Sequence, residues 1–285
     1  MNRPATILDY SRRIEGVARH IGTHLDQPLE LDALAEVACF SPCHFHRIYR
    51  ALTGETVADT IRRHRLHRAA GELVQGTAPV AAVARHAGYG SVHAFTRAFR
   101  AAYGIPPAAY RQRATWSPPP TPPELEDTIM HDVEIQTRTP VRLAALRHAG
   151  SYMEIGHSFE RLQLWAAGRG LIAPGARFIG IYHDDPAAVP AAELRSDACI
   201  SVGPGVEVDG EIRIVELPGG QHAVLRHTGP YAQLETAYSW LYREWLPGSA
   251  EEAADRPCFE EYLNDPRQLP PEEWLTDICL PLTER

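Results

Sequence analysis

The sequence predicts a multidomain protein in which an all-α N-terminal half precedes an α+β C-terminal half. Apolar residues recur with the period of amphipathic helices up to about residue 113, and with strand-like alternation after about residue 131. Charge changes at the same place. Residues 1–115 carry 15 arginines and 9 acidic residues (net +6), whereas residues 116–285 carry 13 and 27 (net −14). The N-terminal half is therefore suited to meet an anion.

The length of 285 residues is sufficient for two domains with separate cores. We expect a helical domain over residues 8–113 and a second domain over residues 132–285. Between them, residues 114–131 contain five prolines within Pro118–Pro123 and predict a stiff, extended linker.

The chain contains no run of eighteen apolar residues, and its first residues lack the apolar stretch of a signal peptide. A cytoplasmic location without a membrane partner is therefore expected. The five cysteines form no CxxC pair, and we expect them to be reduced and mostly buried. Cys43, His44 and His46 occupy helical positions that point in different directions, so we expect no metal there. No P-loop or dinucleotide-binding glycine pattern is found in a suitable context, and no cofactor is expected.

The helical half contains the same plan twice. A short helix over residues 31–38 ends at the sequence CFSP, and the helix that follows buries Phe45, Ile48 and Tyr49. Its opposite face is expected to present a polar, basic stripe to solvent, formed by Cys43, His46, Arg47 and Arg50. The helix over residues 80–87, the glycine turn at residues 88–90 and the cap at Ser91 repeat this arrangement. The second stripe lies 50 residues further on and comprises His93, Thr96, Arg97 and Arg100.

Two helix-turn-helix units joined by a long helix over residues 57–74 therefore form the expected domain. An α-helix fits the major groove of DNA, and arginine pairs with guanine through two hydrogen bonds. The alternative is that the stripes are merely solvated surface. Duplication of the stripe after two suitable turns favours double-stranded DNA as the partner.

The segment VARHAGYGSVHAFTRAFRAAYGIPPAAYR, residues 83–111, resembles the signature of the AraC/XylS family of bacterial transcription regulators, and the resemblance spans about residues 8–113. It implies two recognition helices in successive major grooves. Carried over by position, the residues nearest the bases are Cys43, His46, Arg47, Val92, His93, Thr96 and Arg97. The residues better placed for phosphates are Arg50, Arg62, Arg63, Arg100 and Arg111.

The C-terminal half is also duplicated. LRHAGSY at residues 146–152 recurs as LRHTGPY at residues 225–231, and each copy is a strand, a glycine turn and a tyrosine that opens a helix. The helices are expected near residues 152–167 and 231–244, among strands in the segments DVEIQTRTPVRLAALRH, RFIGIYHDDP, ACISVGPG, EIRIVELPGGQHAVLRH, FEEYLN and TDICLPL. A duplicated strand-helix unit predicts a cleft along a pseudo-twofold axis.

These segments, together with IGIYHDDP and FEEYLNDP, resemble the GyrI-like effector-binding domain over about residues 131–283. Behind an AraC-type domain, the resemblance implies transcription controlled by a small-molecule effector, which alters how the basic half engages promoter DNA or RNA polymerase. Strand alternation places Glu260 and Tyr262 on one face, and the family pattern directs them toward the pocket. We expect Tyr152, Tyr182, Tyr231 and Trp274 to join them. A carboxylate among aromatic rings favours a cationic or hydrogen-bond-donating aromatic ligand.

Other interpretations remain open from the sequence. Glu260 could pair with an arginine, and the aromatic residues could belong to the core. Some GyrI-like proteins are hydrolases of reactive natural products, so Glu260 could serve as a general base beside Tyr262. A drug-sequestering protein is a third possibility, and it predicts no DNA site. We expect a regulator without catalytic residues, structural roles for His148 and His227, and a turn at residues 184–186.

Overall fold

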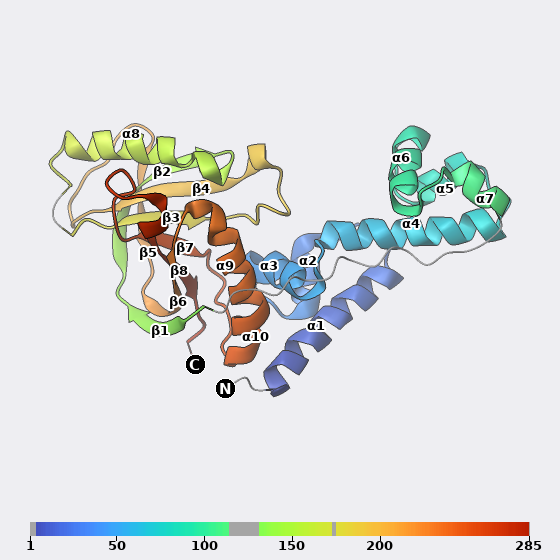
Figure 1. Ribbon diagram of the computed structural model, residues 1–285, viewed down its shortest axis with the longest axis horizontal. Coiled ribbons are helices and arrows are strands. Elements are labelled where there is room, and N and C mark those ends of the chain that lie inside the picture. The colour runs from blue at the N-terminus through green and yellow to red at the C-terminus, as the bar shows by residue number, and fades with distance from the viewer. Residues whose placement is uncertain (1–3, 114–130, 173–174, 285) are drawn as a thin grey trace. The chain divides into compact units, whose positions relative to one another are not determined.

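The computed structural model describes residues 4–113, 131–172 and 175–284 (Figure 1). These residues form two compact units. One holds residues 4–10, 41–51 and the C-terminal region from residue 131, and the other holds residues 11–40 and 52–113. Helix α1 (Pro4–Thr23) contributes to both units. Residues 114–130, which make up nearly all of the predicted linker, lie outside the described residues.

The unit of residues 11–40 and 52–113 is entirely helical, as predicted. Besides the second half of α1 it contains α2 (Leu31–Ala38), α4 (Val57–Gln75), α5 (Val80–His86), α6 (Val92–Tyr103) and α7 (Pro107–Arg113). One buried cluster of its core is formed by Leu66, Ala69, Ala70, Leu73, Val83, Ala84, Ala87, Phe95, Phe99 and Tyr110. The Ser91 hydroxyl accepts a hydrogen bond from the Ala94 amide at 3.1 Å, which confirms the predicted cap of α6.

The turn between α5 and α6 requires a glycine. Gly88 has a φ of +80°, and a Cβ at this position would lie 3.0 Å from the Arg65 guanidinium. The described part of the chain contains no helix long and apolar enough to span a bilayer.

The other unit is built on one antiparallel sheet with the strand order β1-β6-β8-β7-β3-β4-β2-β5. The strands are β1 (Val133–Arg138), β2 (Val141–Ala149), β3 (Phe178–Tyr182), β4 (Arg195–Ser201), β5 (Ile212–Leu217), β6 (Gly220–Thr228), β7 (Phe259–Tyr262) and β8 (Leu275–Pro281). They correspond to the six segments predicted as strands, two of which supply two strands each. The strands of these two segments pair with each other across the segments, β1 with β6 and β2 with β5.

The predicted duplication appears as a pseudo-twofold symmetry of this sheet. The order β7-β8-β6-β1 outward from the centre mirrors the order β3-β4-β2-β5. At the centre, β3 pairs with β7, and Gly180 lies opposite Glu260. These two residues occupy equivalent positions in the two copies, because IGIYHDDP aligns with FEEYLNDP at a spacing of 80 residues. The pseudo-twofold axis therefore passes through the Gly180–Glu260 pair.

Each copy supplies a helix preceded by a short 3-10 turn. The first has η1 (Tyr152–Glu154) and α8 (Gly156–Ala167), and the second has η3 (Tyr231–Gln233) and α9 (Leu234–Trp240). Helix α9 continues through a π-helical turn, η4 (Leu241–Trp245), into α10 (Leu246–Ser249). Short 3-10 turns, η2 (Ala191–Glu193) and η5 (Pro271–Glu273), precede β4 and β8. This unit also contains most of α3 (Pro42–Thr53).

The two faces of the sheet are buried differently. One face packs against the helices, and α8 covers it through Leu162 and Ala166, which contact Ala144, Leu146 and Ile200 (Figure 1). The other face has its own cluster, formed by Leu143, Ala145, Ile179, Ile181, Cys199, Val224, Phe259 and Cys279. This cluster joins residues from both halves of the strand order, so the two copies share one core on this face.

Candidate effector site and nucleic-acid interface

Glu260 lies at the centre of the sheet on the face covered by the helices. Its side chain is directed there by strand alternation, and only 5% of the residue is exposed. The Tyr262 hydroxyl donates a hydrogen bond of 2.9 Å to the Glu260 carboxylate. The Tyr182 hydroxyl lies 2.6 Å from that of Tyr262, so a short hydrogen-bonded chain leads to the carboxylate.

The aromatic residues expected at the site gather around this carboxylate. The Tyr152 and Tyr182 ring centroids lie 4.8 Å apart, those of Tyr231 and Tyr262 5.4 Å apart, and those of Tyr231 and Trp274 4.5 Å apart. The structure thus brings all six predicted residues together. We call this set the Glu260 cluster: Glu260, Tyr262, Tyr182, Tyr152, Tyr231 and Trp274.

Two further aromatic residues beside the cluster were not predicted. The Phe159 ring of α8 lies 5.4 Å from that of Tyr262. Tyr238 of α9 lies close enough to Glu260 for the carboxylate to raise the pKa of its hydroxyl, after burial as the larger cause. A signal for Tyr238 was present in the sequence, because it follows Tyr231 by seven residues, or two helical turns.

The surroundings of Glu260 favour a neutral carboxyl group. Burial raises its pKa from the usual 4.5 to about 7, although the hydrogen bond from Tyr262 and the positive charge of Arg47 act in the opposite direction. Glu260 makes no ion pair among the residues that the structure describes. The alternative of a salt bridge to an arginine does not apply to this glutamate.

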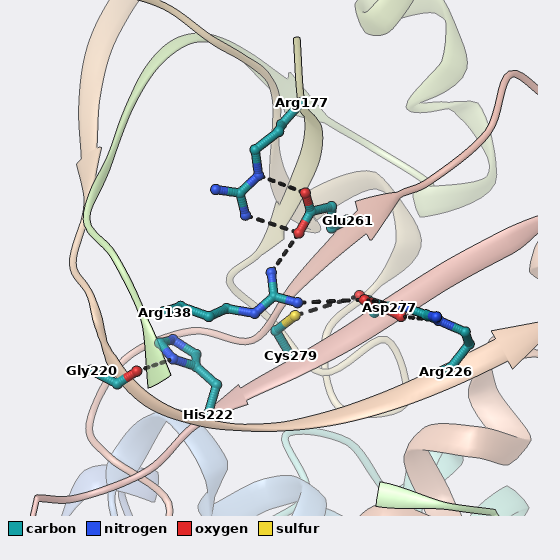
Figure 2. Close-up of polar contacts among 8 residues, drawn as sticks. All are labelled: Arg138, Arg177, Gly220, His222, Arg226, Glu261, Asp277 and Cys279. Carbon is teal, nitrogen blue, oxygen red and sulfur yellow. Dashed lines mark hydrogen bonds and ion pairs between the residues drawn. The ribbon is translucent and has the colours of Figure 1, made fainter. Parts of the chain in front are cut away.

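The neighbouring Glu261 faces the other side of the sheet and carries such ion pairs (Figure 2). Arg177 binds both of its carboxylate oxygens, at 2.6 and 2.9 Å, and Arg138 binds one of them. Although burial alone would raise the pKa of Glu261, its arginine partners hold the pKa below the usual value. Arg138 also reaches Asp277, which accepts two hydrogen bonds from Arg226. Adjacent glutamates therefore have opposite electrostatic environments.

Gly180 provides the space in which the tyrosine hydroxyls meet. A Cβ at this position would lie 2.9 Å from both the Tyr182 ring and the Tyr262 hydroxyl. We expect Gly180→Ala to separate these hydroxyls and to lower the free energy of unfolding by about 1–3 kcal/mol, as overpacking does. Denaturant melts would measure the change. Gly203→Ala is a matched control, since a Cβ there meets nothing within 4 Å, and an equal loss in both variants would contradict the steric argument.

Contrary to expectation, the first basic stripe does not face solvent. Arg47 of α3 stacks on the Tyr238 ring, with the guanidinium carbon 4.6 Å from the ring centroid. It also donates a hydrogen bond of 3.2 Å to the Asp184 carbonyl oxygen, which accepts another from the Tyr152 hydroxyl. Arg50 forms an ion pair of 3.1 Å with Glu235, and Cys43 and His46 are half-buried. The expectation of a free surface was wrong here because sequence periodicity does not show that another part of the chain covers the stripe.

The second stripe, on α6, is accessible. Val92, His93, Arg97 and Arg100 are exposed and Thr96 is half-buried. Neither Arg97 nor Arg100 forms an ion pair within the described ranges. Among the arginines expected at phosphates, Arg62 pairs with Asp59, Arg63 pairs with Glu55, and Arg111 donates to the Leu73 and Ala78 carbonyl oxygens. Arg111 therefore holds the end of α4 in place, a local role that the stripe pattern did not predict.

The residues of the predicted turn and His148 have structural partners, whereas the buried Nε2 of His227 has no hydrogen-bond partner in the described structure. Asp184 accepts hydrogen bonds from the Arg195 amide and guanidinium, and Asp185 accepts one from the Ala187 amide, as in the predicted turn. His148 lies 3.0 Å from the Ser151 carbonyl oxygen. Cys199, Cys258 and Cys279 are buried, whereas Cys39 is exposed. Within the described residues no group of three His, Cys, Asp or Glu residues is arranged to hold a metal.

A separate cavity of about 390 Å³ lies at the β1–β6 edge of the sheet. It contains none of the residues predicted to bind a ligand, and its lining includes Thr137, Gln221, Glu251 and Glu284. It lacks the convergence of aromatic rings on a buried carboxylate that distinguishes the Glu260 cluster.

Comparison with known proteins agrees with this architecture. The GyrI-like small molecule binding domain matches residues 131–283, which is more than half of the chain. The chain belongs to the GyrI-like family. The "DNA gyrase inhibitor" of Erwinia billingiae (strain Eb661) is 30% identical to this GyrI-like protein over 162 residues, which cover 54% of this chain and 98% of the relative.

A helix-turn-helix domain matches residues 34–113 of the GyrI-like protein. "Regulatory protein SoxS" of Escherichia coli (strain K12) is 34% identical over 106 residues, covering 37% of this chain and 99% of the relative. A cryo-EM structure of an EcmrR–DNA complex is 18% identical, with a TM-score of 0.49 over 54% of this chain and 58% of that chain. The GyrI-like protein is an AraC-type DNA-binding regulator with an effector-binding domain.

Proposed function

We propose that the Glu260 cluster binds an aromatic ligand that is cationic or donates hydrogen bonds, and that ligand binding controls how the helix-turn-helix units engage promoter DNA or RNA polymerase. The observation that carries this proposal is a buried carboxylate surrounded by tyrosines, without an arginine ion pair in the described structure. A bound cation would replace the proton that Glu260 holds near neutral pH, and aromatic rings attract cations through their negative faces.

Matched pairs of ligands test the charge preference. Benzamidine and benzamide have the same shape but differ in charge, and calorimetry on the full chain compares their affinities. We expect benzamidine to bind at least about tenfold more tightly, because each 1.4 kcal/mol of interaction with the carboxylate corresponds to a factor of ten. Glu260→Gln should abolish this preference and leave the affinity for benzamide similar. Equal affinities of the wild-type chain for the two compounds would rule out a preference for cationic ligands.

The proposed DNA contacts centre on the exposed face of α6. Val92, His93, Thr96 and Arg97 are the proposed base-reading residues of this helix, and Arg100 is proposed to bind phosphate. In the first helix-turn-helix unit, α3 is the proposed recognition helix. When α3 is not packed against the C-terminal region, Cys43, His46 and Arg47 are proposed to read bases and Arg50 to bind phosphate.

Arg97 provides the test of base reading. On a duplex selected from a random pool by the wild-type chain, we expect Arg97→Ala to lose about 1–3 kcal/mol of binding free energy and to relax one base preference. Arg85→Ala, which alters an exposed arginine of α5 outside the stripe, is the control. Footprint titrations on selected and random duplexes measure both the loss of binding free energy and the change in base preference. Equal weakening on the two duplexes would assign Arg97 to phosphate binding instead.

A second candidate function follows from the same carboxylate. A pKa of about 7 suits a general base, and the Tyr262 hydroxyl is in place to orient a substrate. Incubation with reactive electrophilic natural products, followed by mass spectrometry, would detect a hydrolysed product. Turnover that disappears in Glu260→Gln would establish an enzyme, and stoichiometric binding without product would exclude one.

A further inference from the structure

Helix α3 and the residue before it contact the effector-binding region, residues 131–284, through four side chains spaced three residues apart. The Ser41 hydroxyl donates to Asp255 at 2.7 Å, and Arg50 pairs with Glu235. Between them, His44 is only 1% exposed and both of its ring nitrogens have partners, the Tyr242 hydroxyl at 2.7 Å and the Ala254 carbonyl oxygen at 3.0 Å. Since a buried polar group without partners is costly, this matching of both nitrogens indicates a specific contact.

The π-helical turn η4 positions the partner of His44. Tyr242 lies in this turn, 1% exposed, and its hydroxyl lies 3.1 Å from the Cys258 sulfur as well as 2.7 Å from His44. π-Helical turns are rare and are found often at functional sites. Burial, and then the positive charge of Arg47, lower the pKa of His44 to about 4, so this histidine is neutral at pH 7 and can accept as well as donate a hydrogen bond.

Arg47, the third of the four side chains, lies at the edge of the Glu260 cluster. Its guanidinium stacks on Tyr238, lies 5.9 Å from the Tyr242 ring centroid, and shares the Asp184 carbonyl oxygen with Tyr152. Its charge is among the influences that lower the pKa of Glu260. A planar cation held by aromatic rings and a carbonyl oxygen, near a buried carboxylate, has the chemistry that the proposed ligand requires.

We propose that Arg47 is an internal competitor of the ligand, and that docking of α3 through Arg47 withholds the first recognition helix from DNA. The inference rests on the proposed function, because the ligand is taken to be an aromatic cation. Binding of such a ligand displaces the guanidinium, and α3 is then released with its basic face available for the major groove. Arg47 can lie either at the Glu260 cluster or in the major groove of DNA, but not in both at once. This single side chain thus couples ligand binding to DNA binding.

Competition predicts that removing Arg47 improves ligand binding. We expect Arg47→Gln in the full chain to bind benzamidine about tenfold more tightly than the wild-type chain, because no internal cation has to be displaced. The double variant Arg47→Gln, Glu260→Gln should lose this gain. Benzamidine affinity that is the same in wild type and Arg47→Gln would overturn the internal competition while leaving the proposed ligand site intact. Absence of benzamidine binding from both chains would instead reject the cationic ligand.

Docking is tested separately on the surface that receives α3. Glu235→Arg repels Arg50 without altering a residue proposed to bind DNA or ligand, and Glu272→Arg introduces the same charge change at an exposed site in η5. Relative to Glu272→Arg, we expect Glu235→Arg to accelerate amide hydrogen exchange in α3 and to raise affinity for the selected duplex about threefold or more. Unchanged exchange and affinity would overturn the docking, whatever the outcome with benzamidine.

Discussion

Glu261→Gln is expected to lower the free energy of unfolding of the effector-binding region by about 3 kcal/mol at pH 7, because it leaves Arg138 and Arg177 without their shared counter-charge. The side chains of Glu261 and Arg138 are only 11% and 15% exposed, so water replaces little of the lost interaction. Urea melts followed by circular dichroism measure the loss.

Glu216→Gln is the matched control for this experiment. Glu216 pairs with Arg142 on the same sheet, but its side chain is 61% exposed, and the expected loss is below about 1 kcal/mol. The pH dependence adds a second test. Because the arginines hold the pKa of Glu261 below its usual value, its stabilisation is present above pH 4.5 and is lost as pH falls through the lowered pKa. A loss in Glu261→Gln no larger than that in the control would show that the buried network contributes little to stability.

Glu260→Gln is expected to have the opposite effect on stability. Between the usual pKa of 4.5 and the raised pKa of about 7, folded Glu260 retains a proton that the unfolded chain releases. The free energy of unfolding of the wild-type chain therefore falls as pH rises across this interval. The difference between the two pKa values lowers the free energy of unfolding of the wild-type chain by about 3 kcal/mol at pH 8, relative to low pH. The glutamine variant, which is never charged, should be more stable than wild type by this amount.

Melts at several pH values check the prediction. The two chains should differ little near pH 4.5 and diverge up to about pH 8, and Glu216→Gln should follow the wild-type curve. A glutamine variant that is less stable than wild type at pH 8 would mean that Glu260 is ionised and stabilised in the fold, in which case it would not be poised to gain a cationic partner.

The parts of this structure that depend on local pattern could be predicted from the sequence. The cap at Ser91, the inward Phe95 and Phe99, and the alternation that sends Glu260 and Glu261 to opposite faces follow from the periods of helix and strand. The repeated LRH segments predicted the duplication. The family resemblance directed Glu260 and Tyr262 to one site, and the four other aromatic residues expected beside them lie there.

Features that depend on long-range packing could not be predicted in this way. Arg47 meets Tyr238 and Asp184 across more than 130 residues of sequence, and no local period indicates which surface will cover a basic stripe. Neither the lack of an arginine ion pair at Glu260 nor the ion pairs of Glu261 with Arg138 and Arg177 could be predicted, because they depend on which side chains the folded sheet brings together. Arg111 likewise finds carbonyl acceptors only after α4 and α7 have packed.

The position of Glu260 on the pseudo-twofold axis has a consequence for the charge at this site. A dimer of identical strand-helix units would place the same residue on both sides of the axis, either two glutamates in mutual repulsion or two glycines without a charge. Because this chain encodes the two copies separately, one carries a carboxylate where the other carries the glycine Gly180. The single charge at the axis is therefore an asymmetry that a dimer of identical units could not have.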